Sequence, residues 1–384
     1  MRFLHTSDWH VGKTLKGHDR LPEQREVLAE IVRTAAEHRV DAVLVAGDLY
    51  ETATPTAAAQ QLVVQTLLAL RDGGAEVVAI AGNHDNPSTL DAYRPLAGAA
   101  GITLVGRVRR PADGGVVTLT ARSDGTPLRV AAVPFLSQRW AVRSAELLAN
   151  TAAENSQTYD AWVRKIVAML ATGFAPDAVN VVLAHLTVTG AALGGGERQA
   201  QSIFEYHVPA SAFPAETHYV ALGHLHRRQS IPAACPVHYS GSPLRVDFGE
   251  VDSAPVVLVV EATPDTPARV TEVPVTAARP LRTLRGTLAD LAAADVPEGA
   301  LVKVVVTEPA RAGLREDVRE LFPTALEIHV ARPETPTRPA EPARTDRAPA
   351  DLLRDYLRTR DVADPKVEAL FARLHEDVLT GDGG

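Results

Sequence analysis

Five short stretches of the chain carry side chains that bind metal ions or move protons. They are Asp8-Trp9-His10, Gly47-Asp48, Gly82-Asn83-His84-Asp85, Ala184-His185 and Gly223-His224-Leu225-His226. Oxygen and imidazole ligands without a thiolate suit hard to borderline divalent cations. A glycine before Asp48, Asn83 and His224 allows the tight turn that aims such a side chain over a sheet. These stretches therefore predict a metal centre, provided that the fold brings them together.

The spacing within the stretches favours two cations. Asp8 and His10 are two residues apart, so in extended backbone they point the same way and can share one metal. His224 and His226 also project together, about two strand rises of ~3.3 Å apart. That span lets each take one of two cations lying about 3.5–4 Å apart. A carboxylate bridges such a pair best because each oxygen can hold one ion, and Asp48 is the candidate.

Taken singly, each stretch has an ordinary structural explanation. The chain has 13 histidines, and a lone histidine is more often a structural residue than a ligand. A Gly-Asp pair, or Gly-Asn-His-Asp, can be a turn whose side chains cap the backbone. The combination points to chemistry, because five separate loops would each have to place a metal-competent residue at a strand end by chance.

Buried strands must position these loops, and an apolar run precedes each of them. Runs that barely alternate with polar residues, typical of strands covered on both faces, predict strands at 2–6, 40–46, 75–81, 129–134, 179–184 and 218–222. Helical spacing falls between them at 23–38, 56–71 and 155–172. Such alternation indicates an α/β fold with a largely parallel sheet covered by helices. Because ligands collect at the carboxyl ends of the strands, we expect all five stretches at one edge.

Changes in pattern divide the chain into four parts. The first domain, 1–275, ends in additional β structure, and a small α/β module at 276–332 reads strand, helix, strand, helix, strand. Prolines then mark an extended spacer at 333–350. The tail, 351–384, returns to the spacing of amphipathic helices. The tail either folds back on the body or docks on a partner, and the spacing leaves both open.

Composition limits the class of protein. The chain has 384 residues, a formal charge of −8 and one cysteine, Cys235, which excludes an intramolecular disulfide framework and a multi-cysteine zinc site. No uncharged apolar stretch approaches the ~18 residues of a membrane span, and the N-terminal apolar run is too short for a secretory signal. We therefore expect a reduced, soluble, cytoplasmic protein. Its acidic balance gives no global attraction for nucleic acid, but a local basic groove remains compatible with a DNA enzyme.

The order Asp-x-His, Gly-Asp, Gly-Asn-His-Asp, a later His and Gly-His-x-His resembles the signature of the calcineurin-like metallophosphoesterases. Flanking residues narrow the resemblance to the SbcD-type nuclease subunits, bacterial relatives of the archaeal and eukaryotic Mre nucleases. These are Thr6-Ser7-Asp8-Trp9-His10-Val11-Gly12, Gly47-Asp48-Leu49-Tyr50, Ala184-His185-Leu186-Thr187, Gly223-His224-Leu225-His226-Arg227 and Tyr239-Ser240-Gly241-Ser242-Pro243. The match is strong to about residue 250, moderate in the small module and weakest in the tail.

The resemblance implies a fold and a set of site residues. The fold would be a metallophosphoesterase sandwich of β-sheets flanked by helices, with a small α/β capping domain and a helical tail. One metal would be held by Asp8, His10, Asp48 and His226, and the other by Asp48, Asn83, His185 and His224. His84 would contact the scissile phosphate and help the leaving oxygen depart, and Asp85 would orient the His84 ring. Manganese is the usual ion of the family, although the same ligands suit iron or zinc.

The resemblance also implies a function. A phosphodiester is anionic and repels hydroxide, and two cations both neutralise it and supply a nucleophile at neutral pH. The chain would be a DNA nuclease that cuts double-stranded ends 3′ to 5′ and opens hairpins. It would act at the nucleoid, in DNA repair, recombination and replication. Its partners would be DNA, a second copy of the chain and an SbcC-like coiled-coil ATPase bound by the tail. The apolar stretch 62–70 is a candidate contact between copies, although packing against the sheet accounts better for most of its side chains. Candidates for contact with the DNA backbone are Arg139, Arg227, Arg228 and Arg245.

Two other functions stay open. A different metallophosphoesterase, acting on nucleotides or phosphoproteins, would share the metal ligands, although the phosphatases carry Asp-Arg-Gly after Gly-Asp where this chain has Leu49-Tyr50-Glu51-Thr52. A non-catalytic scaffold of the same fold would be expected to lack ligands, and all seven are present.

Overall fold

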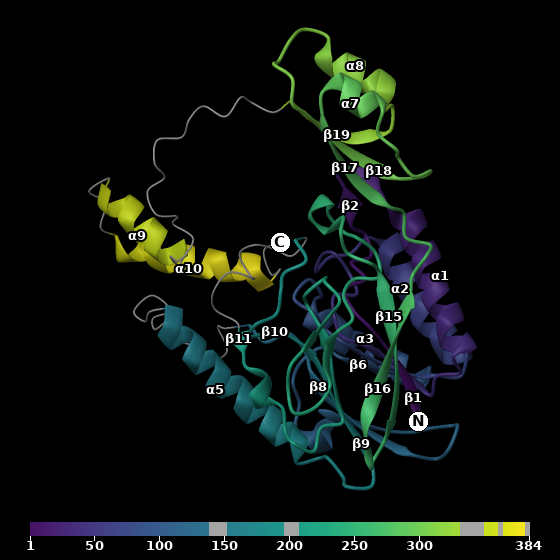
Figure 1. The fold of residues 1–384 in the computed structure, drawn as a ribbon. Coiled ribbons are helices and arrows are strands. Elements are labelled where there is room, and N and C mark those ends of the chain that lie inside the picture. Colours follow the sequence, from purple (N-terminus) through teal and green to yellow (C-terminus); the bar gives the residue numbers. More distant parts are fainter. Residues whose placement is uncertain (138–151, 196–206, 331–348, 360–363, 381–384) are drawn as a thin grey trace.

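The computed structural model describes residues 1–137, 152–195, 207–330, 349–359 and 364–380 (Figure 1). Two six-stranded sheets pack face to face, and helices cover both outer faces. The apolar core between the sheets includes Phe3 and Leu44 from one sheet and Val130 and Val181 from the other. The first domain is therefore a four-layered α/β sandwich.

The first sheet carries three of the predicted site stretches. Its strand order is β16 (Thr266–Pro274), β15 (Val256–Thr263), β1 (Arg2–Thr6), β4 (Ala42–Val45), β5 (Glu76–Ile80) and β6 (Ile102–Val105). The four strands from β1 to β6 run parallel, and β15 pairs antiparallel with β1. Helices α1 (Leu21–Glu37) and α2 (Ala57–Asp72) pack on the outer face, as predicted from helical spacing.

The second sheet carries the remaining site stretches. Its strand order is β13 (Gln229–Ile231), β14 (Val237–Tyr239), β12 (Tyr219–Gly223), β9 (Val179–His185), β8 (Pro127–Val133) and β7 (Val116–Thr120). The four central strands are parallel and both edge strands are antiparallel. Helix α5 (Ala152–Ala171) covers its outer face. Short strand pairs lie elsewhere, β2 (Thr14–Leu15) with β3 (His18–Asp19) and β10 (Thr187–Val188) with β11 (His207–Val208).

The sandwich of β-sheets that the resemblance implies is confirmed, whereas the single, largely parallel sheet expected from periodicity is wrong, because the six predicted strands divide equally between two mixed sheets. A strand in a sandwich is also covered on both faces, so its apolar run looks like that of a central parallel strand. Helix α3 (Pro87–Ala99) was not predicted, because Leu90 is its one buried side chain and no apolar stripe forms. Local capping nevertheless specifies its start, since the Asn86 side chain accepts hydrogen bonds from the amides of Ser88 and Thr89.

The small α/β module has the predicted order of elements. Its parallel strands β17 (Leu281–Gly286), β18 (Leu301–Val306) and β19 (Ala325–Val330) pack with α7 (Leu288–Ala292) and α8 (Leu314–Leu321) around a core of their own. A second apolar cluster joins the module to the first domain through Leu15, Phe248, Leu281 and Leu301. This cluster fixes where the module lies relative to the sandwich.

The tail forms a pair of helices, α9 (Pro349–Thr359) and α10 (Pro365–Thr380), drawn in yellow in Figure 1. Most of the predicted spacer lies outside the described residues. Near the end of α10, the carboxylate of Glu376 is buried and accepts a hydrogen bond from Ser137 Oγ. The tail therefore folds back on the first domain at this point. Within the parts of the chain that the structure describes, none of the helices has the length and apolar character of a membrane span.

Candidate metal centre

All seven predicted metal ligands meet at one end of the sandwich. The loops after β1, β4 and β5 of the first sheet bring three stretches, and β9 and the loop after β12 of the second bring the others. None of these side chains is more than 5% exposed: Asp8, His10, Asp48, Asn83, His185, His224 and His226. The structure thus brings together the whole predicted set, from both sheets.

The first group of ligand atoms comes from Asp8, His10, His226 and Asp48. One atom from each of Asp8, His10 and His226 lies within 4.8 Å of the others. The Nε2 atoms of His10 and His226 are 3.0 Å apart. Asp48 Oδ2 is 3.7 Å from His10 Nε2. These four residues are the predicted ligands of one metal.

A second group surrounds the amide oxygen of Asn83. That oxygen lies 2.8 Å from His185 Nε2 and 2.9 Å from His224 Nδ1. Asp48 Oδ2 is 3.5 Å from His185 Nε2. Since the same carboxylate oxygen also lies beside His10, Asp48 occupies a position between the two groups.

In three of these histidines, the Nδ1 atom is hydrogen-bonded to a carboxylate or to a backbone carbonyl oxygen. His10 Nδ1 is 2.9 Å from Glu51 Oε2, and His226 Nδ1 is 2.7 Å from Glu250 Oε1. His185 Nδ1 donates to the carbonyl oxygen of Ala46 at 2.7 Å. Sequence reasoning missed Glu51 and Glu250. Glu51 lies three residues after Asp48, and this closeness to a predicted ligand could have indicated it. Glu250 lies in no motif.

This hydrogen bonding shows that the residues fit divalent cations. A histidine that donates Nδ1–H to a carboxylate carries a lone pair on Nε2 when neutral. His10 and His226 then direct two lone pairs at each other across 3.0 Å, and neither can donate to the other. In the second group the Asn83 oxygen is an acceptor too, and Asp48 keeps the His185 ring protonated until a cation takes the place of that proton. A cation in each group would satisfy these acceptors.

The backbone of the site is held in conformations that non-glycine residues rarely adopt. Left-handed φ angles occur at Asp8 (55°), His10 (46°), Asp48 (52°) and His224 (99°). Such strain persists where the surrounding structure over-determines it, and it gathers at functional sites. Close packing adds to the constraint, because a Cβ atom at Gly82 would lie 2.1 Å from Asp48 Oδ1.

Charge in the buried site shifts several pKa values. Burial acts to raise the pKa of Asp48, but the neighbouring histidines, His185 foremost, hold it well below its usual range. Burial also acts to raise the pKa of Glu51, but the hydrogen bond from His10 and nearby positive charge lower it to about 2. Burial acts to lower the pKa of His185, but the negative charge of Asp48 outweighs this effect and raises the pKa to about 9. The site therefore concentrates negative charge on Asp48 and Glu51.

His84 and Asp85 lie where predicted, but Asp85 does not orient the His84 ring. Its carboxylate instead accepts hydrogen bonds from the backbone amides of Leu49, Tyr50 and Gly82, at 3.2, 3.0 and 2.8 Å. His84 Nδ1 donates to the carbonyl oxygen of Glu51 at 2.7 Å. The predicted role of Asp85 is therefore wrong, because the three amides occupy its oxygens. Asp85 joins the Asp48 loop to the Asn83 loop.

The arginines proposed for DNA contact differ in their surroundings. The Arg228 side chain is 15% exposed and forms an ion pair with Glu272. Arg245 Nε donates to the carbonyl oxygen of Ser253. Arg227 is exposed, and Arg139 lies outside the described residues. Arg227 alone of these described residues thus keeps the exposure that the prediction requires.

We expect the substitution Glu250→Gln to weaken cation binding about ten- to hundred-fold, the usual effect of losing a carboxylate that holds a metal-binding histidine. The neutral amide no longer fixes the His226 tautomer that places the lone pair on Nε2. Glu51→Gln should act in the same way through His10. Titration with manganese followed by calorimetry measures both affinities. Glu261→Gln, an exposed glutamate paired with Arg2, is the matched control, and wild-type affinity in the Glu250 variant would contradict the assignment.

Comparisons with known proteins agree with this geometry. Residues 1–228 match the family model of the calcineurin-like phosphoesterases. The chain is 39% identical to the SbcD subunit of the SbcCD nuclease of Bacillus subtilis (strain 168) over 285 residues, 73% of this chain and 71% of that protein. It is 32% identical to the Escherichia coli (strain K12) protein of the same name over 308 residues, 76% of this chain and 73% of that protein. The chain therefore belongs to the calcineurin-like phosphoesterase family and, within it, to the SbcD nuclease subunits.

Proposed function

We propose that this metal-dependent nuclease subunit cleaves DNA ends and hairpins, with two manganese ions as its working cofactor. The observation that supports the proposal is the position of one buried oxygen. Asp48 Oδ2 lies 3.7 Å from His10 Nε2 and 3.5 Å from His185 Nε2, between two groups of ligands. A carboxylate between two cation sites is the arrangement that phosphodiester hydrolysis by two metals requires.

When bound, two divalent cations would clamp the phosphate oxygens and lower the pKa of a water molecule. We assign one to Asp8, His10, Asp48 and His226, and the other to Asp48, Asn83, His185 and His224. Glu51 and Glu250 keep the imidazoles of His10 and His226 in the tautomer that binds a cation. The seven residues are almost completely buried, so the surrounding packing holds the ligand atoms in place.

His84 has the geometry of a proton donor. Its Nδ1 is held by the Glu51 carbonyl oxygen, and Oε2 of the same residue lies 3.7 Å from that nitrogen. Its backbone N–H donates to Asp48 Oδ1 at 2.8 Å, which fixes the residue beside the bridging carboxylate. We assign His84 Nε2 to the scissile phosphate, where it would donate a proton to the departing 3′ oxygen.

The purified full-length chain tests this function when it is supplied with manganese and four substrates: linear duplex DNA, hairpin DNA, a cyclic nucleotide and a phosphoprotein. We expect cleavage of both DNA substrates, with label at the 3′ end released first, and no turnover of the other two. Turnover of the cyclic nucleotide alone would favour a nucleotide phosphodiesterase. Two bound metals without any turnover would favour a scaffold. We also propose that the protein acts at the nucleoid, in DNA repair, recombination and replication.

We further propose that the tail binds a coiled-coil ATPase of the SbcC type, since the relatives are named as parts of an SbcCD nuclease. The α9–α10 pair presents apolar side chains that the described part of the chain leaves exposed. Tyr356 is 55%, Leu370 44% and Leu374 51% exposed. An amphipathic helix pair of this kind suits the surface of another helix.

Removal of residues 345–384 should abolish co-elution with the ATPase and leave manganese-dependent cleavage of linear DNA by the isolated chain unchanged. The reason is that the deletion removes the apolar face of the tail but none of the predicted ligands. In the full chain, Leu370→Asp combined with Leu374→Asp should have the same effect. Leu321→Asp, at an exposed leucine of the small module, is the control. Undiminished co-elution of the deleted chain would contradict a binding role for the tail.

We also propose that two copies of the chain associate through α2 and α3. Within the stretch predicted for this contact, Leu62, Val63, Leu67 and Leu70 are buried against the sheet. Val64 is 45% and Leu68 37% exposed, and they line an apolar groove of about 320 Å³ with Tyr93 and Leu96. Leu96 itself is 74% exposed. Such a contiguous apolar surface, continuous across two helices, fits a symmetric contact with a second copy.

A charged residue at the centre of this groove should separate the copies. We expect Leu96→Glu combined with Leu68→Glu to halve the molecular mass in solution, because the two introduced carboxylates meet their symmetry mates across the contact. Light scattering after size-exclusion chromatography measures the mass. The control Leu193→Glu, at a leucine of similar exposure elsewhere, should keep the dimer, and an unchanged mass in the double variant would exclude this face.

A further inference from the structure

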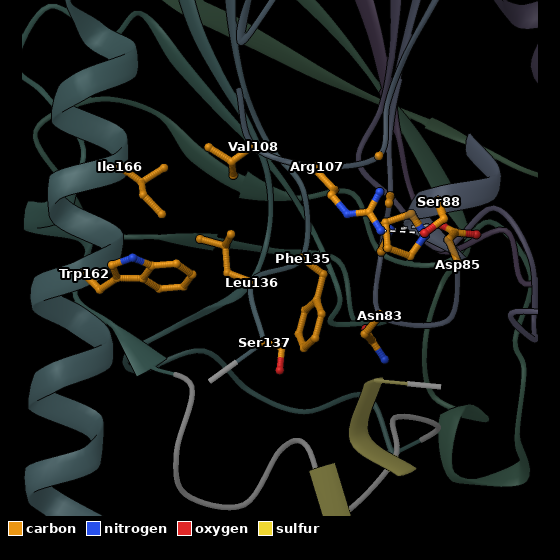
Figure 2. A pocket seen from close by; sticks show the side chains of 14 residues that line it. Asn83, Asp85, Ser88, Arg107, Val108, Phe135, Leu136, Ser137, Trp162 and Ile166 are labelled. Carbon is orange, nitrogen blue, oxygen red and sulfur yellow. Dashed lines mark hydrogen bonds between the residues drawn. The ribbon is translucent and has the colours of Figure 1, made fainter. Parts of the chain in front are cut away.

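A cavity of about 380 Å³ lies beside the second group of ligands (Figure 2). Its walls come from the loop after β5, the start of α3, the loop after β6, the residues after β8 and the partly buried side of α5. Among its lining residues are Asn83, Arg107, Phe135, Leu136, Trp162 and Ile166. Its volume lies in the range of sites that enclose small organic molecules.

The cavity adjoins the predicted metal centre. Asn83, whose amide oxygen contacts His185 and His224, is part of its wall. The ring of Phe135 lies between the cavity and these imidazoles, with its centroid 6.2 Å from that of His185 and 6.1 Å from that of His224. A group attached to a phosphate at the second metal would therefore enter the cavity within the length of one nucleotide.

The lining combines aromatic faces with one positive charge at the rim. Phe135 and Trp162 are both only half-buried, and Figure 2 shows them on opposite sides of Leu136. Arg107 is half-exposed, and its guanidinium is held by Ser88 Oγ and Asp91 Oδ2. Half-exposed aromatic rings are the surfaces on which proteins stack nucleobases, and a fixed guanidinium nearby suits an adjacent phosphate.

We infer that this cavity binds the unpaired nucleobase of the nucleotide that carries the scissile phosphate. The inference rests on the proposed function, because it takes the phosphate to lie at the metal centre. The stacked base of a duplex cannot enter a cavity of this kind without leaving its partner. The cavity therefore selects DNA whose base pairs open easily, such as frayed ends and hairpin tips, without reading sequence. Phe135 and Trp162 are positioning residues in this account, since they hold the substrate and take no part in the chemistry.

A substrate that lacks one base tests the inference. The full-length protein with manganese is given two DNA molecules that differ at the cleaved nucleotide, which is intact in one and a tetrahydrofuran abasic residue in the other. Base–aromatic stacking predicts that loss of the base lowers kcat/KM roughly five- to hundred-fold in the wild-type protein, mostly through KM. Phe135→Leu and Trp162→Leu should slow cleavage of the intact substrate only, so that the two substrates become equivalent. Phe174→Leu, at a half-buried aromatic residue of the same core cluster outside the cavity, should keep the discrimination.

Binding provides a readout that does not depend on cleavage. We expect a deoxynucleoside 5′-monophosphate to quench the tryptophan fluorescence of the manganese-loaded protein and deoxyribose 5-phosphate to leave it unchanged, and the quenching should vanish in Trp162→Phe. Equal cleavage of intact and abasic DNA by the wild-type protein, or equal slowing of both by the variants, would overturn the inference. Failure of the proposed function would show differently, as no cleavage of any DNA. In that case the fluorescence measurement still tests the inference, and a mononucleotide that causes no quenching would overturn it.

Discussion

Asp48→Asn should reduce DNA cleavage by at least about a thousand-fold, equivalent to ~4 kcal/mol in the activation free energy. The amide offers one oxygen where the carboxylate offers two, and it carries no charge to offset two cations. The oxygen that lies between His10 and His185 would then be unable to serve both groups of ligands. We expect metal analysis of the purified variant to find at most one tightly bound manganese ion per chain.

Asp41→Asn is the matched control for this experiment. Asp41 is also a buried aspartate, and its carboxylate accepts hydrogen bonds from the backbone amides of Arg2 and Ser123. Loss of that charge should lower the stability of the fold without changing the metal content or the cleavage rate of the folded protein. Two bound ions and normal cleavage in Asp48→Asn would show that Asp48 does not bridge, and the two-metal assignment would be wrong.

His84→Gln should lower cleavage about 10²- to 10⁴-fold while both metals stay bound, the range expected for loss of a general acid. Glutamine can still donate to the Glu51 carbonyl oxygen, so the loop keeps its main contact, but it cannot deliver a proton to the leaving oxygen. The measurement pairs initial cleavage rates with metal content in the same preparations.

Metal content is essential here because a ring nitrogen of His84 also lies within 4.8 Å of ligand atoms from His10 and Asp48. Loss of a manganese ion in the variant would make His84 a ligand. Full metal content with undiminished cleavage would remove it from the reaction. A DNA substrate with a better leaving group than a 3′ alkoxide should restore much of the lost rate, because such a group departs without protonation.

The predicted site followed from local features, and its completion depended on tertiary structure. Each predicted ligand stands directly after an apolar run, and any α/β arrangement gathers such positions at strand ends. Periodicity alone could not predict the division into two sheets, because a strand such as β9, buried at all its residues, has the same pattern in a parallel sheet and in a sandwich. The supporting carboxylates were hidden for a different reason. Glu250 reaches His226 from a short helical turn that no motif marks.

The contacts of Asp85 also depended on tertiary structure. Asp85 follows His84 directly, and adjacency in sequence suggested a contact between their side chains. In the folded loop the carboxylate points toward three backbone amides, and a carbonyl oxygen holds the ring instead. Residue types and spacing indicate which chemistry is present, whereas the partner of each polar group is decided by the path of the backbone between them.

The proposed metal ligands are divided between the two halves of the sandwich. Asp8, His10, Asp48 and Asn83 all lie in the first quarter of the chain, whereas His185, His224 and His226 come from the second sheet. A nascent chain that has emerged only as far as β6 would therefore hold only part of each proposed ligand set. Cations bound by residues of both halves would tie the halves together, so chelation should lower the melting temperature of the finished protein.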